Sequence, residues 1–310
     1  MNTIKSIIST LFIATIISFS GITLAQVSTP AQIATVKKMQ TLADQGVRVA
    51  QYNLGYLYYK GEGVQKDDKK AFVLFSKAAE KGLKEAQFNL GMLYMTGEGT
   101  PKDESKAATW FSKAAEQNEK ESQVNLGSLY ASGIGIQKDE KKAFYWFSKA
   151  AEQGQPIAQF NMGIAYASGI GIQKDEKKAF YWYSKAAEQG DPMAQVNIGY
   201  YYEHGMGTPK DVKKAFYWYS KAATTGLREA QFNMGDSYYD GIGIPKDEKI
   251  AFSWYSKSAE QGFKEAQFKI GKLYEQGIAI PKDDKKAYYW YKKAAEQGDL
   301  EALKIIKHLK

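Results

Sequence analysis

Apolar residues recur along the chain at helical spacing, in segments that come in pairs. In the first segment Ala50, Leu54 and Tyr58 fall at positions i, i+4 and i+8, which places them on one face of an α-helix. Gly61 follows, and glycine tolerates the left-handed conformation that ends many helices. Asp67 precedes the second segment, where its side chain can accept hydrogen bonds from the first N–H groups of a helix. The pattern predicts two helices joined by a short loop.

This two-helix pattern returns every 36 residues without insertion or deletion. With Ala50 as the first position of a repeat, equivalent starts follow at residues 86, 122, 158, 194, 230 and 266. Glycine recurs at the sixth position of each repeat and tyrosine three residues later. One helix pair cannot bury its own apolar face, so neighbouring pairs must stack. The sequence therefore predicts an all-α solenoid.

Four segments are expected along the chain. Residues 1–25 are interpreted as a signal peptide, 26–49 as an N-terminal capping helix, 50–298 as seven repeats and 299–310 as a C-terminal capping helix. Lys5 precedes an apolar run, and small residues that end at Ala25 offer a cleavage site. We expect cleavage after Ala25, a periplasmic or secreted mature protein, and no integral membrane span in it.

The amino-acid composition argues against several classes of function. The 42 basic and 34 acidic residues are interspersed, whereas nucleic-acid binding needs a basic stripe. The chain has no cysteine, and its two histidines do not lie at metal-ligand spacing. Motifs of serine nucleophiles and of phosphate-binding loops do not occur in the sequence. We therefore expect no enzyme activity, no cofactor, no metal site and no nucleic-acid partner.

The repeated pattern also carries a family resemblance. Ala-Gln-x-Asn-(Leu/Met/Ile)-Gly-x-x-Tyr, followed by Lys-Asp-x-x-Lys-Ala-x-x-Trp-x-x-Lys-Ala-Ala-Glu-Gln-Gly, resembles the Sel1-like repeat family, a relative of the tetratricopeptide repeat. The departures are Ala279, Asn118 and Lys269, each in place of a pattern residue. The resemblance implies a right-handed superhelix that acts as an adaptor in envelope assembly, signalling or host interaction. Cysteine-rich members described as penicillin-binding or as β-lactamases supply the alternative, a cell-wall or β-lactam enzyme, although this chain lacks their cysteines.

In stacked helix pairs of this kind the first helices line the concave surface, and we expect a protein or peptide partner to bind there. We expect the scaffold itself to be a monomer. The candidate partner-binding residues are Asn53, Asn89, Asn125, Asn161, Asn197 and Asn233, with Tyr52, Tyr56, Phe88, Met92, Phe160, Tyr200 and Phe232. An amide can both donate to and accept from a peptide backbone, and aromatic and Met side chains suit protein recognition.

Two alternatives stay open for these residues. Each asparagine can bond within or between repeats, and the residues equivalent to Tyr52 can pack against a neighbouring repeat. The equivalents of Tyr56 change from mostly apolar to charged along the chain, so we expect an apolar N-terminal half of the surface and a more charged C-terminal end. A second candidate surface carries the outward Tyr145, Tyr181, Tyr217 and Tyr289, which can instead lie against neighbouring lysine stems.

Overall fold

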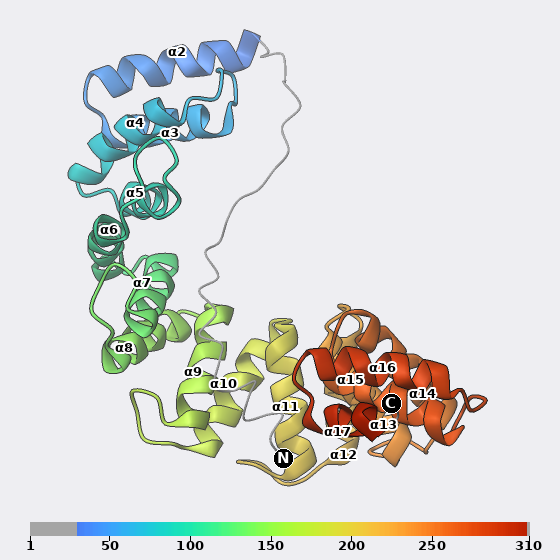
Figure 1. Ribbon diagram of the computed structural model, residues 1–310. Helices are drawn as coiled ribbons and strands as arrows, with labels where there is room; N and C mark the ends of the chain where they lie inside the picture. The colour runs from blue at the N-terminus through green and yellow to red at the C-terminus, as the bar shows by residue number, and fades with distance from the viewer. Residues whose placement is uncertain (1–29, 309–310) are drawn as a thin grey trace. The chain divides into compact units, whose positions relative to one another are not determined.

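The computed structural model describes residues 30–308, and the expected signal peptide lies outside this range. Every regular element of the described residues is an α-helix, and the helices follow one another as packed pairs (Figure 1). The predicted all-α solenoid is confirmed. The chain divides between Lys174 and Asp175 into two compact units. We call residues 30–174 the N-terminal half and residues 175–308 the C-terminal half.

The N-terminal half begins with a single helix, and three complete helix pairs and the first helix of a fourth repeat follow it. The helices are α2 (Pro30–Asp44), α3 (Arg48–Lys60), α4 (Asp68–Glu80), α5 (Lys84–Thr96), α6 (Glu104–Glu116), α7 (Lys120–Ser132), α8 (Glu140–Glu152) and α9 (Pro156–Ser168). Helix α2 packs on α3, which is the arrangement expected of a capping helix.

The C-terminal half contains the second helix of the fourth repeat, three complete pairs and a last single helix. They are α10 (Glu176–Glu188), α11 (Pro192–His204), α12 (Val212–Ala223), α13 (Arg228–Asp240), α14 (Glu248–Glu260), α15 (Lys264–Gln276), α16 (Asp284–Glu296) and α17 (Leu300–His308). Helix α17 packs on α16. None of the helices in the described range is long and apolar enough to cross a membrane.

The helix ends follow the sequence pattern. Asp67 accepts a hydrogen bond from the backbone N–H of Lys70 at 2.9 Å and caps α4, which satisfies one of the N–H groups that a helix start leaves unpaired. Gly61 ends α3 with a φ of 74°, in the left-handed region that glycine enters without a steric penalty. The same aspartate caps recur at Asp103, Asp139, Asp175, Asp211, Asp247 and Asp283.

In six repeats the recurring glycine of the first helix lies under an aromatic ring of the second helix. A Cβ atom added at Gly91 would lie 2.7 Å from Cε1 of Phe111, closer than a real side chain can approach. Phe111 is buried beside Ala107 and Leu129. The glycine thus lets two helix backbones approach closely while a large ring fills the space beside them.

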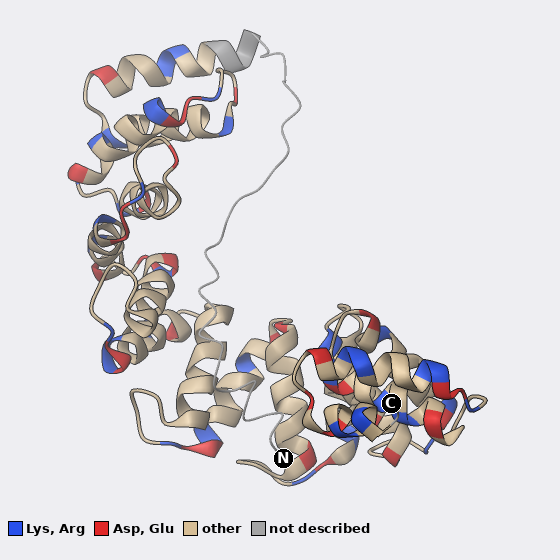
Figure 2. Ribbon diagram, viewed as in Figure 1, with Lys and Arg blue, Asp and Glu red and all other residues tan. Residues whose placement is uncertain are grey.

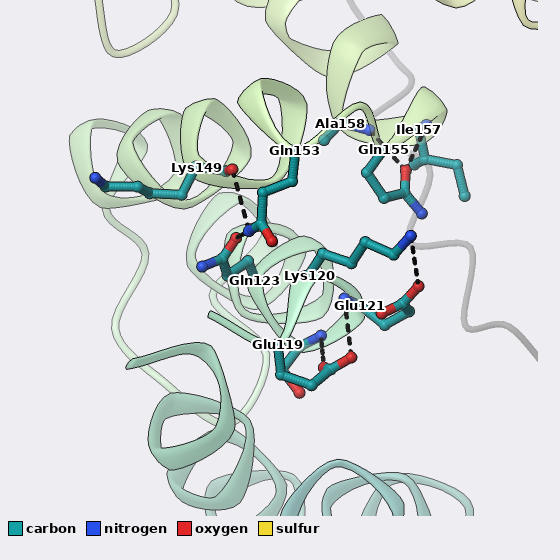
Figure 3. A network of polar contacts seen from close by, with 10 residues as sticks. Glu119, Lys120, Glu121, Gln123, Lys149, Gln153, Gln155, Ile157 and Ala158 are labelled. Carbon is teal, nitrogen blue, oxygen red and sulfur yellow. Dashed lines mark hydrogen bonds and ion pairs between the residues drawn. The ribbon is translucent and has the colours of Figure 1, made fainter. Parts of the chain in front are cut away.

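Buried glutamines connect consecutive repeats. Nε2 of Gln123 donates to the carbonyl of Ala115 at the end of the preceding helix, at 3.1 Å. Its Oε1 accepts from Nε2 of Gln153 at 2.7 Å (Figure 3). The donor bond recurs at Gln51, Gln87, Gln159, Gln195 and Gln267. Because a buried amide left without partners destabilises the fold, these bonds favour one fixed register between neighbouring repeats.

The exceptions in this glutamine series have a local cause. Oε1 of Gln51 and Oε1 of Gln195 are buried without a hydrogen-bond partner among the described residues. The residue equivalent to Gln153 is Lys81 for the first and Thr225 for the second. Neither position supplies the amide donor that completes the pair elsewhere.

Candidate partner-binding surface

The predicted asparagine series is largely enclosed in the fold. Asn125, Asn161 and Asn197 are buried, Asn89 and Asn233 are partly buried, and Asn53 is exposed. Nδ2 of Asn125 donates to Sδ of Met92 at 3.8 Å, and Nδ2 of Asn197 donates to the carbonyl of Met193 at 2.9 Å. The described amides therefore do not form one continuous exposed ladder, and these two bond within the protein.

The predicted aromatic stripe packs against the core rings of its own repeats. Tyr52, Phe88 and Phe232 are partly buried, and Phe160 is buried. The ring centroids of Phe88 and Phe111 are 6.0 Å apart, and those of Tyr52 and Phe75 are 5.7 Å apart. These side chains therefore form the inner, partly buried layer of the candidate partner-binding surface.

A small apolar hollow opens beside this layer in the N-terminal half. It is lined by Met92, Met95, Phe111, Asn125, Ser128, Leu129 and Ile134, and its volume is about 40 Å³. Sites for whole small molecules have volumes of roughly 300–1,000 Å³. The hollow therefore suits the end of one apolar side chain rather than a complete substrate.

The hollow brings together two of the predicted residues, Met92 from α5 and Asn125 from α7. Sequence reasoning missed its other lining residues, of which Ile134 is 41% exposed. The sequence feature that could have indicated the hollow is Ser128, the smallest residue in the series equivalent to Tyr56. A short side chain at that position leaves space that Met92 and Ile134 border.

In the C-terminal half, tyrosines at equivalent positions of three repeats each donate to a carboxylate. The Tyr219 hydroxyl donates to Glu203 Oε2 at 2.8 Å, and the Tyr255 hydroxyl donates to Asp236 Oδ1 at 2.6 Å. Burial raises the pKa of both tyrosines well above its usual range, so the phenols stay protonated and act as donors. A third pair joins Tyr291 to Glu275 at 2.6 Å.

Two acids that cap first helices are also enclosed. The Glu119 carboxylate accepts from the backbone N–H groups of Glu121 and Ser122 at the start of α7 (Figure 3). Burial is the largest influence and raises the pKa of Glu119 to about 7. Asp191 caps α11 in the same way, and burial raises its pKa as well. Their partners are backbone groups of their own helices, which makes them structural acids.

The outward tyrosines are half exposed and accompanied by lysines. The Lys149 ammonium lies 5.9 Å from the ring centroid of Tyr145, and the same arrangement recurs at Tyr181, Tyr217 and Tyr289. In the described range no group of three His, Asp or Glu side chains could hold a metal ion. Lys and Arg alternate with Asp and Glu on the helices and loops of each half (Figure 2).

The repeated unit is similar to a known family of repeats. A family model described as Sel1 repeat matches residues 48–83, 84–119, 120–155, 156–191, 192–226, 228–263 and 264–299. These matches begin two residues before the start chosen above at Ala50, at the first residue of α3. No match was found among curated proteins.

Two crystal structures share much of the chain. A protective antigen present in uropathogenic Escherichia coli strains, which displays an SLR fold, is 40% identical with a TM-score of 0.79. The match covers 88% of this chain but 59% of the antigen's chain, so this protein spans less than two thirds of that relative. A Sel1 repeat protein from Oxalobacter formigenes is 36% identical with a TM-score of 0.70, over 89% of this chain and 80% of that one.

Proposed function

Because the chain belongs to the Sel1 repeat family, we propose that it is an exported, monomeric scaffold that holds a segment of another protein against the first helices of its repeats. Sel1 repeat solenoids are generally non-catalytic scaffolds for protein interaction. The observation that carries the proposal is the hollow beside Met92, because its volume of about 40 Å³ suits the end of one apolar side chain.

The anchoring group is therefore an apolar side chain of the partner. Such a group gains about 25 cal/mol for each Å² of apolar surface removed from water. Interfaces concentrate their binding energy in a few enclosed contacts of this type. The partly buried Phe88 and Met92 pack against the same apolar cluster as Phe111 and Leu129.

The proposal is tested by filling the hollow. Ile164 stands at the position equivalent to Ser128 in the next repeat, so Ser128→Ile introduces a side chain that the repeat already accommodates. The mature chain and this variant are used to capture partners from the envelope fraction of the source cells. We expect capture to fall at least tenfold with Ser128→Ile, while circular dichroism stays helical.

Tyr145→Ala, on the outward face, is the matched control and should leave capture unchanged. Capture that survives Ser128→Ile would place the interaction elsewhere.

Export is proposed on the N-terminal sequence pattern. The similar E. coli protein is a protective antigen, and by this likeness we propose that the present protein also faces a host. Fusion of residues 1–25 to a reporter that is active only outside the cytoplasm should give activity. Replacement of the apolar run by charged residues should abolish it, and activity that persists would contradict the assignment.

A further inference from the structure

A lysine of the chain itself occupies an aromatic and acidic site in the C-terminal half. The Lys269 ammonium lies 3.3 Å from Asp236 Oδ1 and 5.5 Å from the ring centroid of Tyr239. It also lies 5.8 Å from the ring centroid of Tyr255, whose hydroxyl holds Asp236. Cations are attracted to ring faces within about 6 Å. These residues therefore show how two tyrosines and a carboxylate of this fold seat an ammonium group.

Lys269 stands at the repeat position that is asparagine in every earlier repeat. Its side chain reaches back from α15 to Asp236 on α13, the first helix of the preceding repeat. Asn125 reaches back in the same way from α7 to Met92 on α5. The side chain at this position is thus directed at the equivalent of Tyr56 in the repeat before it.

One repeat earlier, the same set of groups is present without the lysine. The residue equivalent to Asp236 is Tyr200 and the residue equivalent to Tyr239 is Glu203, so the ring and the carboxylate exchange places. Tyr219 is the equivalent of Tyr255, and its hydroxyl holds Glu203 at 2.8 Å. The position of Lys269 is taken by Asn233, whose side chain is shorter and uncharged.

This earlier site is acidic, and the Tyr219 ring in it is buried. Tyr200 and Glu203 are only partly buried, and Glu203 has no ion-pair partner among residues 30–308. The ring of His204 lies against Tyr200, with centroids 4.1 Å apart. The Glu203 carboxylate and the Tyr200 ring are complementary to a cation.

We propose that Tyr200, Glu203 and Tyr219 bind the ammonium group of a lysine side chain that belongs to the partner polypeptide. The inference rests on the proposed function, because it supplies the chemistry of the segment that the scaffold holds. Helix α11 is the first helix of its repeat, like α5 and α7 at the hollow. The partner polypeptide then carries a basic residue that meets the C-terminal half.

The test uses two blocked pentapeptides with the sequence Ala-Leu-Lys-Leu-Ala, one of which has norleucine in place of lysine. Norleucine keeps most of the apolar stem and removes the charge. Titration calorimetry on the mature protein should show the lysine peptide binding about tenfold more tightly, as a partly desolvated cation–π contact and an ion pair together allow. The preference should shrink at high salt.

Two reciprocal variants locate the preference. Asn233→Lys should supply an internal ammonium to the earlier site and abolish the preference for lysine. Lys269→Asn should vacate the occupied site and raise the number of lysine-peptide sites from one to two. Glu203→Gln, which keeps the shape and removes the charge, should reduce the preference without changing the helical circular dichroism.

Equal affinity for the two peptides, no binding of either, or a lysine preference that persists in Asn233→Lys would each overturn the proposal. These outcomes are independent of the hollow, which lies in the other half. Loss of capture by Ser128→Ile without any lysine preference would refute the ammonium site alone. A lysine preference with capture insensitive to Ser128→Ile would refute the apolar anchor alone.

Discussion

The two halves of the protein differ by one hydroxyl group at a recurring buried position. The ring that covers the glycine of the first helix is Phe75, Phe111 and Phe147 in the three complete repeats of the N-terminal half. In the C-terminal half the residue at this position is Tyr183, Tyr219, Tyr255 and Tyr291. All of these side chains are buried. The repeat framework is the same, so the comparison shows which surface residues accompany the added hydroxyl.

The difference extends to the surface above the ring. Beside Phe111 lies an apolar hollow, whereas Tyr219, Tyr255 and Tyr291 each donate to a carboxylate. A buried phenol hydroxyl usually finds an acceptor, and at Tyr219, Tyr255 and Tyr291 a partly buried carboxylate supplies it. The core residue and the surface residue therefore change together at these three positions. The partner surface of each half is thus determined partly by residues that a ligand does not touch.

The largest expected effect comes from removing one of these hydroxyl groups. Tyr255→Phe leaves the partly buried carboxylate of Asp236 with one donor fewer and should destabilise the fold by about 2 kcal/mol. Tyr201 is the matched control, because its buried hydroxyl has no hydrogen-bond partner among the described residues. Tyr201→Phe should be neutral or stabilising. Urea unfolding followed by circular dichroism measures both, and equal losses would contradict the role of the Tyr255–Asp236 bond.

A smaller effect should distinguish the helix packing of the two halves. A Cβ atom at Gly235 would lie 2.4 Å from Cδ1 of Tyr255, whereas at Gly55 the nearest atom, Cδ1 of Phe75, is 3.0 Å away. Overpacking costs about 1–3 kcal/mol, while Gly→Ala in a helix gains up to about 1 kcal/mol. Gly235→Ala should therefore lower the melting temperature and Gly55→Ala should change it little. If Gly55→Ala lowered the melting temperature more than Gly235→Ala, the closer ring contact at Gly235 would not be the cause of the difference.

The smallest expected effect concerns a feature that both halves share, the enclosed capping acid. Since the pKa of Glu119 is raised from 4.5 to about 7, the folded state binds a proton more tightly than the unfolded state. Stability from this group is present below pH 4.5 and is lost as the pH rises to 7. Glu119→Gln should raise the melting temperature by about 2 °C at pH 8 and by less at pH 5.

The residue equivalent to Glu119 in the next repeat is Gln155, which caps α9 through Oε1. Gln155→Glu is the reciprocal variant and should introduce the same pH dependence there. A pH-independent effect of Glu119→Gln would assign it to packing instead.

Much of the fold could be predicted from the sequence because its signals are local. Asp67 and Gly61 each determine the end of an adjacent helix. The 36-residue period requires that neighbouring repeats stack, whichever residues make the contacts. The N-terminal capping helix was expected within residues 26–49, and α2 covers Pro30–Asp44. The last helix was expected within residues 299–310, and α17 covers Leu300–His308.

The surface was harder to predict because it depends on how neighbouring helices cover one another. A helical wheel placed Asn161 and Phe160 near the exposed side of an isolated helix, yet both are buried in the structure. The Tyr219–Glu203 and Tyr255–Asp236 pairs join residues 16 and 19 positions apart. Only the packing of two helices reveals these pairs, although the change from Phe to Tyr along the repeats was visible in the sequence.

The glutamine bonds also bear on how such a chain can change in length. Each glutamine needs only a carbonyl from the repeat before it and, where present, an amide that follows it by 30 positions. Ser132–Trp146 and Ser168–Trp182 have identical sequences, which indicates that one repeat arose by copying another. Since a copied repeat brings its own glutamine and its own carbonyl with it, recombination can add or remove 36 residues and leave the other junctions unchanged.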